Sequence, residues 1–139
     1  MAYWLMKSEP DVFSFDDLQA KTTHNEPEEW GGVRNYAARN NMRAMALGDE
    51  AFFYHSNIGR EIVGIVEIVE AHMTDPTDDT GKWAAVRVKP KTKLPSVVTL
   101  KQVKAEPQLA DMQLVKLSRL SMAEVMPDEW SIILEMAGV

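Results

Sequence analysis

Cysteine is absent from this sequence of 139 residues. Its absence excludes disulfide bonds, thiolate catalysis, and zinc or iron–sulfur sites held by cysteine, and it is compatible with a reducing compartment. No run reaches the roughly 20 apolar residues that span a bilayer. The segment Met1 to Lys7 is too short, and polar too soon after Lys7, for a signal peptide. We therefore expect a cytoplasmic protein that makes no contact with a membrane.

Basic residues are also few. Lysine and arginine number 15 against 21 aspartates and glutamates, which gives a net charge of −6. A strong non-specific nucleic-acid binder relies on a large basic surface, so this balance argues against that class. The exception is the segment from Lys82 to Lys104, which contains seven basic residues and no acidic one. An acidic protein with such a segment can still meet an anion on one face.

Short catalytic motifs are missing as well. The three histidines, His24, His55 and His72, lie far apart and in no metal-ligand spacing. The sequence contains neither H-E-x-x-H nor G-x-S-x-G, and Gly31-Gly32 fits neither a phosphate loop nor a dinucleotide fingerprint. We therefore expect a protein that is not an enzyme and that holds neither a metal nor a cofactor.

The length and composition fit a single globular domain, residues 1–139, with 45% hydrophobic residues. Apolar and alternating runs predict strands at residues 3–7, 50–57, 61–73, 83–91 and, once or twice, within 114–121. Helical spacing predicts helices at 14–20, 34–47, from 99 onward and from 127 onward, with a loop over 21–29. This pattern indicates an α+β fold, a small open barrel or strongly curled sheet flanked by short helices.

Single residues mark features within these elements. Ser14 stands three residues before Asp17, as in the capping box that starts a helix. Gly64, inside a long apolar strand, indicates a bend or a close approach between the backbone and a neighbour. Pro127 and Gly138 bracket the last helix, in the positions where proline starts and glycine ends a helix.

The segment Trp30-Gly31-Gly32-Val33-Arg34-Asn35-Tyr36 leads through two glycines into a helix start. Unpaired N–H groups in the first turn of a helix favour an acceptor or an anion. Arg34 is unusual here, because a cation at this end opposes the helix macrodipole. Two interpretations remain open. Either Arg34 pairs with a structural carboxylate and Trp30 belongs to the core, or Trp30 is the stacking plate of a pocket in which Asn35 makes hydrogen bonds.

The segment Phe53-Tyr54-His55-Ser56-Asn57 places a histidine beside a serine. Adjacent side chains of a strand point to opposite faces, so these two should not form a nucleophile–base pair. Tyr54 with Ser56, or His55 with Asn57, would instead present one face to a planar polar ligand. The alternative is a buried strand that ends in a polar turn.

A third candidate is the basic face of the strand at residues 83–91. Alternation places Arg87, Lys89 and Lys91 on one face, with Lys93 just beyond. Such a stripe is either a solvated surface or a track that contacts phosphates and positions a nucleic-acid strand without reading its sequence.

Four ordered stretches resemble the EVE domain family. They are residues 3–10 (YWLMKSEP), 30–40 (WGGVRNYAARN), Gly48-Asp49 followed by 53–57 (FYHSN), and 119–121 (RLS). The resemblance extends over essentially the whole chain. It implies a PUA-like fold, related to YTH and ASCH domains, in which helices flank a small β-barrel.

The resemblance also implies a function: recognition of a modified base in DNA or RNA, held splayed out in a pocket. The positions that match the pocket lining are Lys7, Ser8, Trp30, Arg34, Asn35, Tyr54, His55, Ser56 and Asn57. Arg119 and Ser121 match another motif of the family, in the pocket or in a structural role. Arg87, Lys89 and Lys91 would hold flanking phosphates weakly.

The resulting hypothesis is a non-catalytic binding module whose partner is nucleic acid with modified bases. We expect a monomer or weak dimer, and we expect that Trp30→Ala abolishes the preference for a modified base. The alternatives are a small-molecule or protein-interaction domain, or an enzyme or accessory domain acting on a nucleoside, that uses the same cleft.

Overall fold

The computed structural model describes residues 2–21, 27–31, 36–117 and 119–139. In this part of the chain the strands are β1 (Tyr3–Ser8), β2 (Glu28–Trp30), β3 (Glu50–His55), β4 (Glu61–Thr74), β5 (Ala84–Thr99) and β6 (Met122–Val125). The helices are α1 (Phe15–Lys21), α2 (Tyr36–Ala44), α3 (Leu100–Ala105), the 3₁₀ turn η1 (Pro107–Leu109), α4 (Gln113–Lys116) and α5 (Pro127–Met136).

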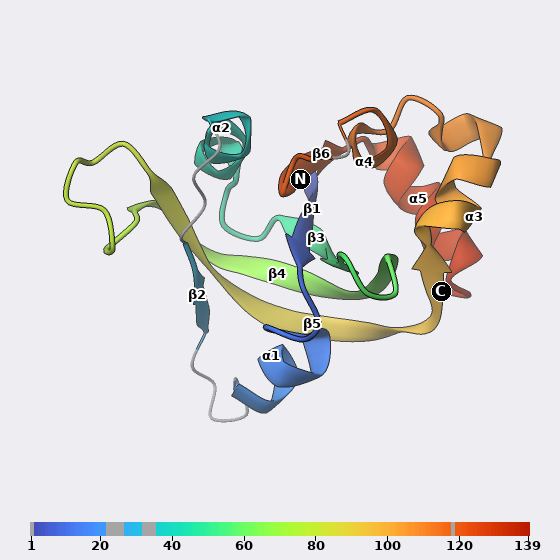
Figure 1. Cartoon of the computed structure of the whole chain (residues 1–139), viewed down its shortest axis with the longest axis horizontal. Coiled ribbons are helices and arrows are strands. Elements are labelled where there is room, and N and C mark those ends of the chain that lie inside the picture. The colour runs from blue at the N-terminus through green and yellow to red at the C-terminus, as the bar shows by residue number, and fades with distance from the viewer. Residues whose placement is uncertain (1, 22–26, 32–35, 118) are drawn as a thin grey trace.

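The described strands form one mixed sheet in the order β2-β5-β4-β3-β1-β6 (Figure 1). β1 and β3 run parallel, and the other neighbours are antiparallel. The long β4–β5 pair shifts its register at four places, and each such irregularity bends and twists a sheet. The sheet therefore curls strongly but stays open, with β2 and β6 at its edges. This confirms the α+β curled sheet flanked by short helices that the sequence predicts.

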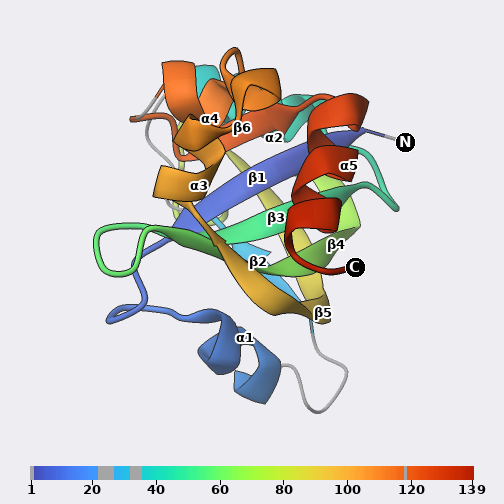
Figure 2. The same ribbon diagram turned by 90° about the vertical axis from the view of Figure 1, so that its right-hand side faces the viewer.

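Helices cover the two faces of the sheet unequally (Figure 2). Trp130 of α5 stacks on Tyr3 and Phe52, with ring centroids 4.4 and 3.9 Å apart. On the other face, Phe15 of α1 meets Phe53 edge-on at 5.4 Å. Neighbouring side chains of β3 thus point to opposite faces, as strand geometry requires. This alternation decides which residues of β3 can reach the candidate site.

Gly64 lies where β4 packs against Phe15 of α1. A Cβ atom at this position would stand 2.5 Å from Cζ of Phe15, inside any real contact distance. The prediction of a close approach at Gly64 is confirmed, and the neighbour is an aromatic ring that is itself only 1% exposed.

Local signals locate both ends of α1 and of α5. In the capping box of α1, the Asp17 N–H donates to Ser14 Oγ at 3.0 Å and the Ser14 N–H donates to the Asp17 carboxylate at 2.9 Å. α5 begins at Pro127, and Gly138 follows it with a φ of +81°, a conformation that glycine adopts without strain.

Two predictions about secondary structure are wrong. Residues 114–121 were expected to contain strand, but α4 occupies the first part and β6 begins only at Met122. A short apolar run does not distinguish a strand from a single helical turn that buries Leu114. The expected loop over 21–29 contains the start of β2, whose Glu28 and Glu29 pair with β5 at the sheet edge. An edge strand in solvent needs no apolar pattern.

The helix expected at 34–47 is described as α2 from Tyr36 onward, and it ends at Ala44, before the predicted end at residue 47. Its predicted apolar stripe, Ala38, Met42 and Met45, is buried to 1% exposure or less. Arg34 and Asn35 lie outside the described residues, so their two interpretations stay open. In the described part of the chain, no helix is long and apolar enough to cross a membrane.

Candidate functional site

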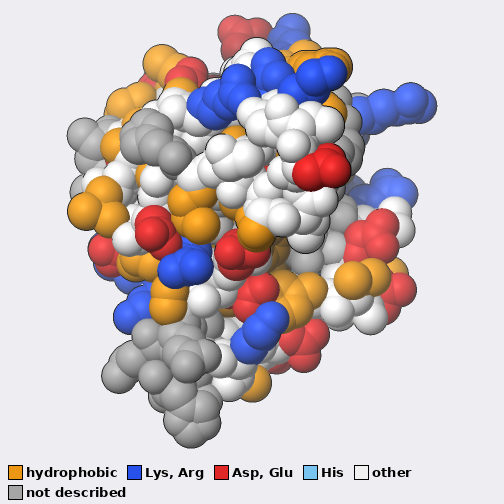
Figure 3. Space-filling view, turned by 90° about the vertical axis from the view of Figure 1, so that its left-hand side faces the viewer, with side chains coloured by type: hydrophobic (Ala, Val, Ile, Leu, Met, Phe, Trp, Pro, Cys, Tyr) orange, Lys and Arg blue, Asp and Glu red, His pale blue; other side chains and the backbone are white. Residues whose placement is uncertain are grey.

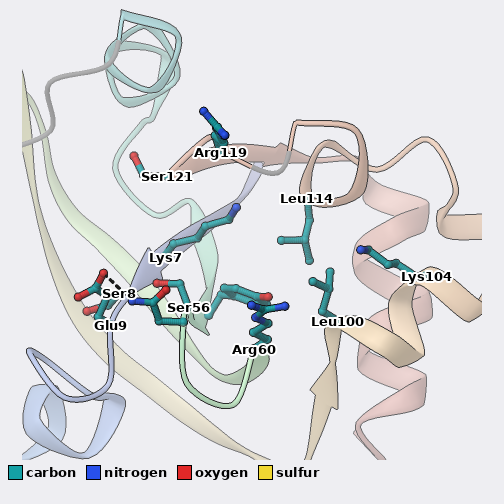
Figure 4. Close-up of a pocket in the computed structure, with 12 residues that line it drawn as sticks. Lys7, Ser8, Glu9, Ser56, Arg60, Leu100, Lys104, Leu114, Arg119 and Ser121 are labelled. Atoms are coloured by element: carbon teal, nitrogen blue, oxygen red, sulfur yellow. Dashed lines mark hydrogen bonds between the residues drawn. The ribbon is translucent and has the colours of Figure 1, made fainter.

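A cavity of about 580 Å³ opens where β1 and β3 end, between the β3–β4 turn and α3 (Figure 4). β1 and the residue after it contribute Lys7, Ser8 and Glu9, and β3 with its turn contributes Tyr54, Ser56, Asn57 and Arg60. Leu100 and Lys104 of α3, Leu114 of α4, and the segment before β6 with Arg119 and Ser121 complete the lining.

Backbone pairing brings these separate segments together. Because β1 and β3 are parallel, both strands end on the same side of the sheet, with Lys7 beside Tyr54 in register. The Ser56 N–H donates to the carbonyl of Ser8 at 2.9 Å, which carries the pairing into the turn. The Lys7 N–H donates to the carbonyl of Ser121 at 3.0 Å. The three segments therefore have fixed relative positions.

Lys7 and Tyr54 form the inner wall of the cavity. The Lys7 ammonium lies 5.8 Å from the centre of the Tyr54 ring, near the outer limit of a cation–π contact. Burial lowers the pKa of Lys7 and raises the pKa of Tyr54, the latter against the opposing influence of the Arg60 charge. Tyr54 therefore keeps its phenolic proton at neutral pH and can donate a hydrogen bond.

The polar rim is partly occupied by internal hydrogen bonds. The Ser8 hydroxyl donates to the carbonyl of Phe13 at 2.6 Å, so its oxygen remains an acceptor. The Asn57 amide donates to the Glu9 carboxylate at 3.1 Å, drawn as a dashed line in Figure 4. Asn57 has a φ of +68°, a left-handed conformation in which asparagine is enriched. The bond from Asn57 holds the Glu9 carboxylate at the rim of the cavity.

The lining is strongly cationic for a protein of net charge −6. Lys7, Arg60, Lys104 and Arg119 face one acid, Glu9. Among the described residues, Arg60, Lys104 and Arg119 have no salt-bridge partner within 4.0 Å. A concave wall with unbalanced positive charge attracts and concentrates anions.

The basic face of β5 is different. Arg87 lies 3.0 Å from the Glu70 carboxylate and 3.9 Å from that of Glu29, and Lys91 lies 3.2 Å from Glu50. Figure 3 looks onto the β2 side of the molecule, and basic and acidic side chains lie next to one another in the lower half of the view. These pairs favour the solvated-surface interpretation, and a phosphate role for Arg87, Lys89 and Lys91 stays a prediction.

The cavity gathers most of the residues that the sequence predicts for the site. They are Lys7, Ser8, Tyr54, Ser56, Asn57, Arg119 and Ser121. Two others lie elsewhere. Trp30 packs edge-on against Phe13 and Phe53 at 6.1 and 5.7 Å, on the face of β3 opposite Tyr54. It reaches the cavity only indirectly, since Phe13 also accepts the Ser8 hydrogen bond.

His55 lies on the same side of β3 as Phe53 and anchors the start of α1. The Phe15 N–H donates to His55 Nε2 at 3.0 Å, so this nitrogen is an acceptor and the imidazole is neutral. Burial is the main cause that lowers the pKa of His55, against the opposing charges of Glu61 and Asp16. His55 and Ser56 therefore point apart, as expected, and form no nucleophile–base pair.

The lowered pKa of His55 predicts a pH dependence of stability. The unfolded chain takes up a proton near pH 6.5, whereas the folded protein resists it until lower pH. The unfolded state binds more protons in that window, so the free energy of unfolding should fall as the pH drops from about 7 towards 5. Urea unfolding of wild type and His55→Gln at several pH values measures this. The variant retains His24 and His72, and an identical slope in both proteins would contradict the prediction.

Sequence reasoning missed Glu9, Arg60, Leu100, Lys104 and Leu114 in the cavity lining. Leu100 and Lys104 had a usable signal. They follow a correctly predicted helix start and stand four residues apart, which places them on one face. Arg60 had only its place in a turn, and its position across from α3 depends on the tertiary fold.

The open, curled sheet with helices on its flanks is the architecture of a PUA-like domain. The chain belongs to the EVE domain family, whose model matches residues 2–136. It is similar to thymocyte nuclear protein 1 of Mus musculus, at 36% identity over 166 residues that cover 96% of this chain and 73% of that protein.

Solved structures agree with this assignment. The NMR structure of Rpa0253 from Rhodopseudomonas palustris has a TM-score of 0.93 and 51% identity, covering 99% of this chain and 94% of that one. The human THYN1 protein, solved in complex with DNA that contains 5-methylcytosine, has a TM-score of 0.88 and 33% identity. This similarity covers 100% of this chain and 99% of the human one.

Proposed function

We propose that this protein is a non-catalytic module that binds a modified base in DNA, with the base turned out of the duplex into the cavity beside Tyr54. The observation that carries the proposal is the cavity, which combines an aromatic wall, serine hydroxyls and unbalanced positive charge. The relative solved with 5-methylcytosine-containing DNA supports DNA as the polymer and a methylated cytosine as the first ligand to test.

The lining offers each kind of contact that a turned-out nucleotide needs. Tyr54 and the acceptor oxygen of Ser8 can form hydrogen bonds to the edge of a base. Lys7 and Arg119 supply positive charge for its phosphate. Leu100 and Leu114 form an apolar patch on which an added methyl group can rest.

The energies are of the right order for a recognition that is selective but modest. Turning a base out of the stack costs a few kcal/mol, and contact with an aromatic ring returns about 1–3 kcal/mol. A methyl group that fills an apolar pocket is worth about 1.4 kcal/mol, which corresponds to roughly tenfold preference. The hydrogen bonds and phosphate contacts provide the rest of the affinity, without any covalent step.

The decisive measurement is the affinity for two duplexes that differ in a single cytosine 5-methyl group. We expect tighter binding of the methylated duplex. In Leu100→Ala this preference should fall towards unity, because the methyl group loses its apolar contact. The control is Leu117→Ala, an exposed leucine outside the cavity lining, which should retain the preference.

A second variant tests the polar side of the cavity. Lys7→Met keeps the aliphatic stem and removes the charge, so both duplexes should bind roughly tenfold more weakly, the loss of one charge-assisted hydrogen bond. A 2-aminopurine placed next to the target cytosine should brighten on binding if the base leaves the stack. Equal affinity for the two duplexes, or unchanged binding by Leu100→Ala and Lys7→Met, would overturn the proposal.

A further inference from the structure

A second cavity, of about 480 Å³, continues from the first along the start of α3. It is lined by Gly59, Arg60, Thr99, Leu100, Lys101 and Lys104. Arg60, Leu100 and Lys104 line both cavities, so the two hollows share a wall. Figure 4 shows these three side chains at the side of the first cavity that faces α3. A nucleic-acid strand that leaves the first cavity on this side would enter the second cavity directly.

The charge of the second cavity is entirely positive. Its lining contains Arg60, Lys101 and Lys104 and no acidic residue. Within the described part of the chain none of these three has a salt-bridge partner, whereas Lys91 and Lys93 of β5 pair with Glu50 and Asp16 at 3.2 and 3.0 Å. Lys101 and Lys104 stand three residues apart on one helical face, where like charges repel. Repulsion between these lysines is therefore not offset by nearby acids, whereas acids offset the charges of Lys91 and Lys93 on β5.

The backbone at Arg60 is also held in a costly conformation. Its φ is +50°, the left-handed region that residues with a Cβ atom seldom occupy. The Leu100 N–H donates to the Arg60 carbonyl at 2.8 Å, which ties the turn to the start of α3. Glycine would adopt this conformation freely, yet the position carries arginine. Strain of this kind is a pointer to function when an independent feature, here the cationic cavity, lies beside it.

The lining excludes a second base as the occupant. None of the lining residues is aromatic, and the Thr99 hydroxyl already accepts the Gln102 N–H at 3.1 Å in the capping box of α3. Cationic side chains without a stacking surface suit phosphate groups, which position a nucleic acid without reading its sequence.

We propose that Arg60, Lys101 and Lys104 form a phosphate track that holds the DNA backbone flanking the turned-out base. This inference rests on the proposed function and adds the path of the strand, from the first cavity across the start of α3. It assigns the phosphate contacts to α3 in place of the basic face of β5.

The test uses Lys101, which lines only the second cavity. Lys101→Ala and Lys104→Ala should each weaken binding of methylated and unmethylated duplexes by the same factor, roughly eightfold at 0.1 M salt. Each should also reduce the slope of log affinity against log salt by about 0.9, the value for one lost phosphate contact. The matched control is Lys21→Ala on α1, an exposed lysine that pairs with Glu28 at 2.7 Å and lines neither cavity, and it should change neither quantity.

Arg60→Gly separates charge from backbone strain. The variant should unfold at the same or a higher temperature than wild type, because glycine relieves the left-handed conformation, while its DNA binding weakens. Unchanged affinity and salt slope in Lys101→Ala would overturn the track. Equal affinity for methylated and unmethylated DNA, with the losses in Lys101→Ala intact, would overturn the base-binding proposal and leave the track standing. Absence of DNA binding by the wild type would overturn both.

Discussion

Replacing Gly64 with valine is expected to lower the free energy of unfolding by about 3 kcal/mol, at the upper end of the usual cost of overpacking a core. A Cβ atom at this position would stand 2.5 Å from the ring of Phe15. The ring cannot move aside, since it is 1% exposed and packs against Phe53 at 5.4 Å. A domain of ordinary stability, about 5–15 kcal/mol, would lose a large share of it. Urea unfolding followed by circular dichroism measures the change.

The matched control repeats the substitution at position 64 in a variant in which a smaller side chain replaces Phe15. Phe15→Leu costs stability by itself, because it removes buried ring atoms. In the Phe15→Leu background, however, Gly64→Val should cost at least 1 kcal/mol less than in wild type, the coupling expected of two side chains in contact. Equal costs in both backgrounds would show that the Phe15 ring does not restrict position 64.

The contact between Gly64 and Phe15 also shows why the sequence predicts β4 but does not predict that α1 packs against it. An isolated glycine in an apolar strand predicts close packing, and Gly64 confirms it. The identity of the neighbour depends on where α1 crosses the sheet, which no local pattern contains. The starts of α1, α3 and α5 were predictable for the opposite reason: the capping bonds of Ser14 and Thr99 join residues three apart, and Pro127 itself opens α5.

The residues of the candidate site also fall into two groups: those placed by local strand geometry and those placed by the tertiary fold. Strand alternation correctly separates His55 from Ser56, because facing is a local property of β3. It does not reveal that Trp30 lies on the His55 side of the strand, since that depends on the pairing of β2 with β5. Arg60 and Lys104 meet only because α3 follows β5 back to the β3–β4 turn. Basic residues were counted in the segment that contains Lys104, but charge along a sequence does not indicate which cations are left without acids.

The second large effect is expected at Asp49, the acid of the Gly48-Asp49 motif. Its side chain is buried, 4% exposed, and accepts the Trp4 indole N–H at 3.0 Å, the Ala46 N–H at 2.9 Å and the Ala2 N–H at 3.2 Å. Asp49→Ala leaves the buried Trp4 indole N–H and the two backbone N–H groups without this acceptor, and a buried donor left unsatisfied costs about 1–3 kcal/mol. We expect a total loss of about 3 kcal/mol in the free energy of unfolding.

Trp4→Phe provides the control, because it removes the indole donor and leaves a ring in place. In that background Asp49→Ala should cost at least 1 kcal/mol less, and a cost as large as in wild type would contradict the assigned role. Asp49 lies beneath the start of β1, whereas the cavity lies at its far end, beside Lys7. At low temperature, where Asp49→Ala remains folded, its preference between methylated and unmethylated duplexes should match wild type. The Gly48-Asp49 motif would then have a structural role, and base recognition would take place at the opposite end of β1 and β3.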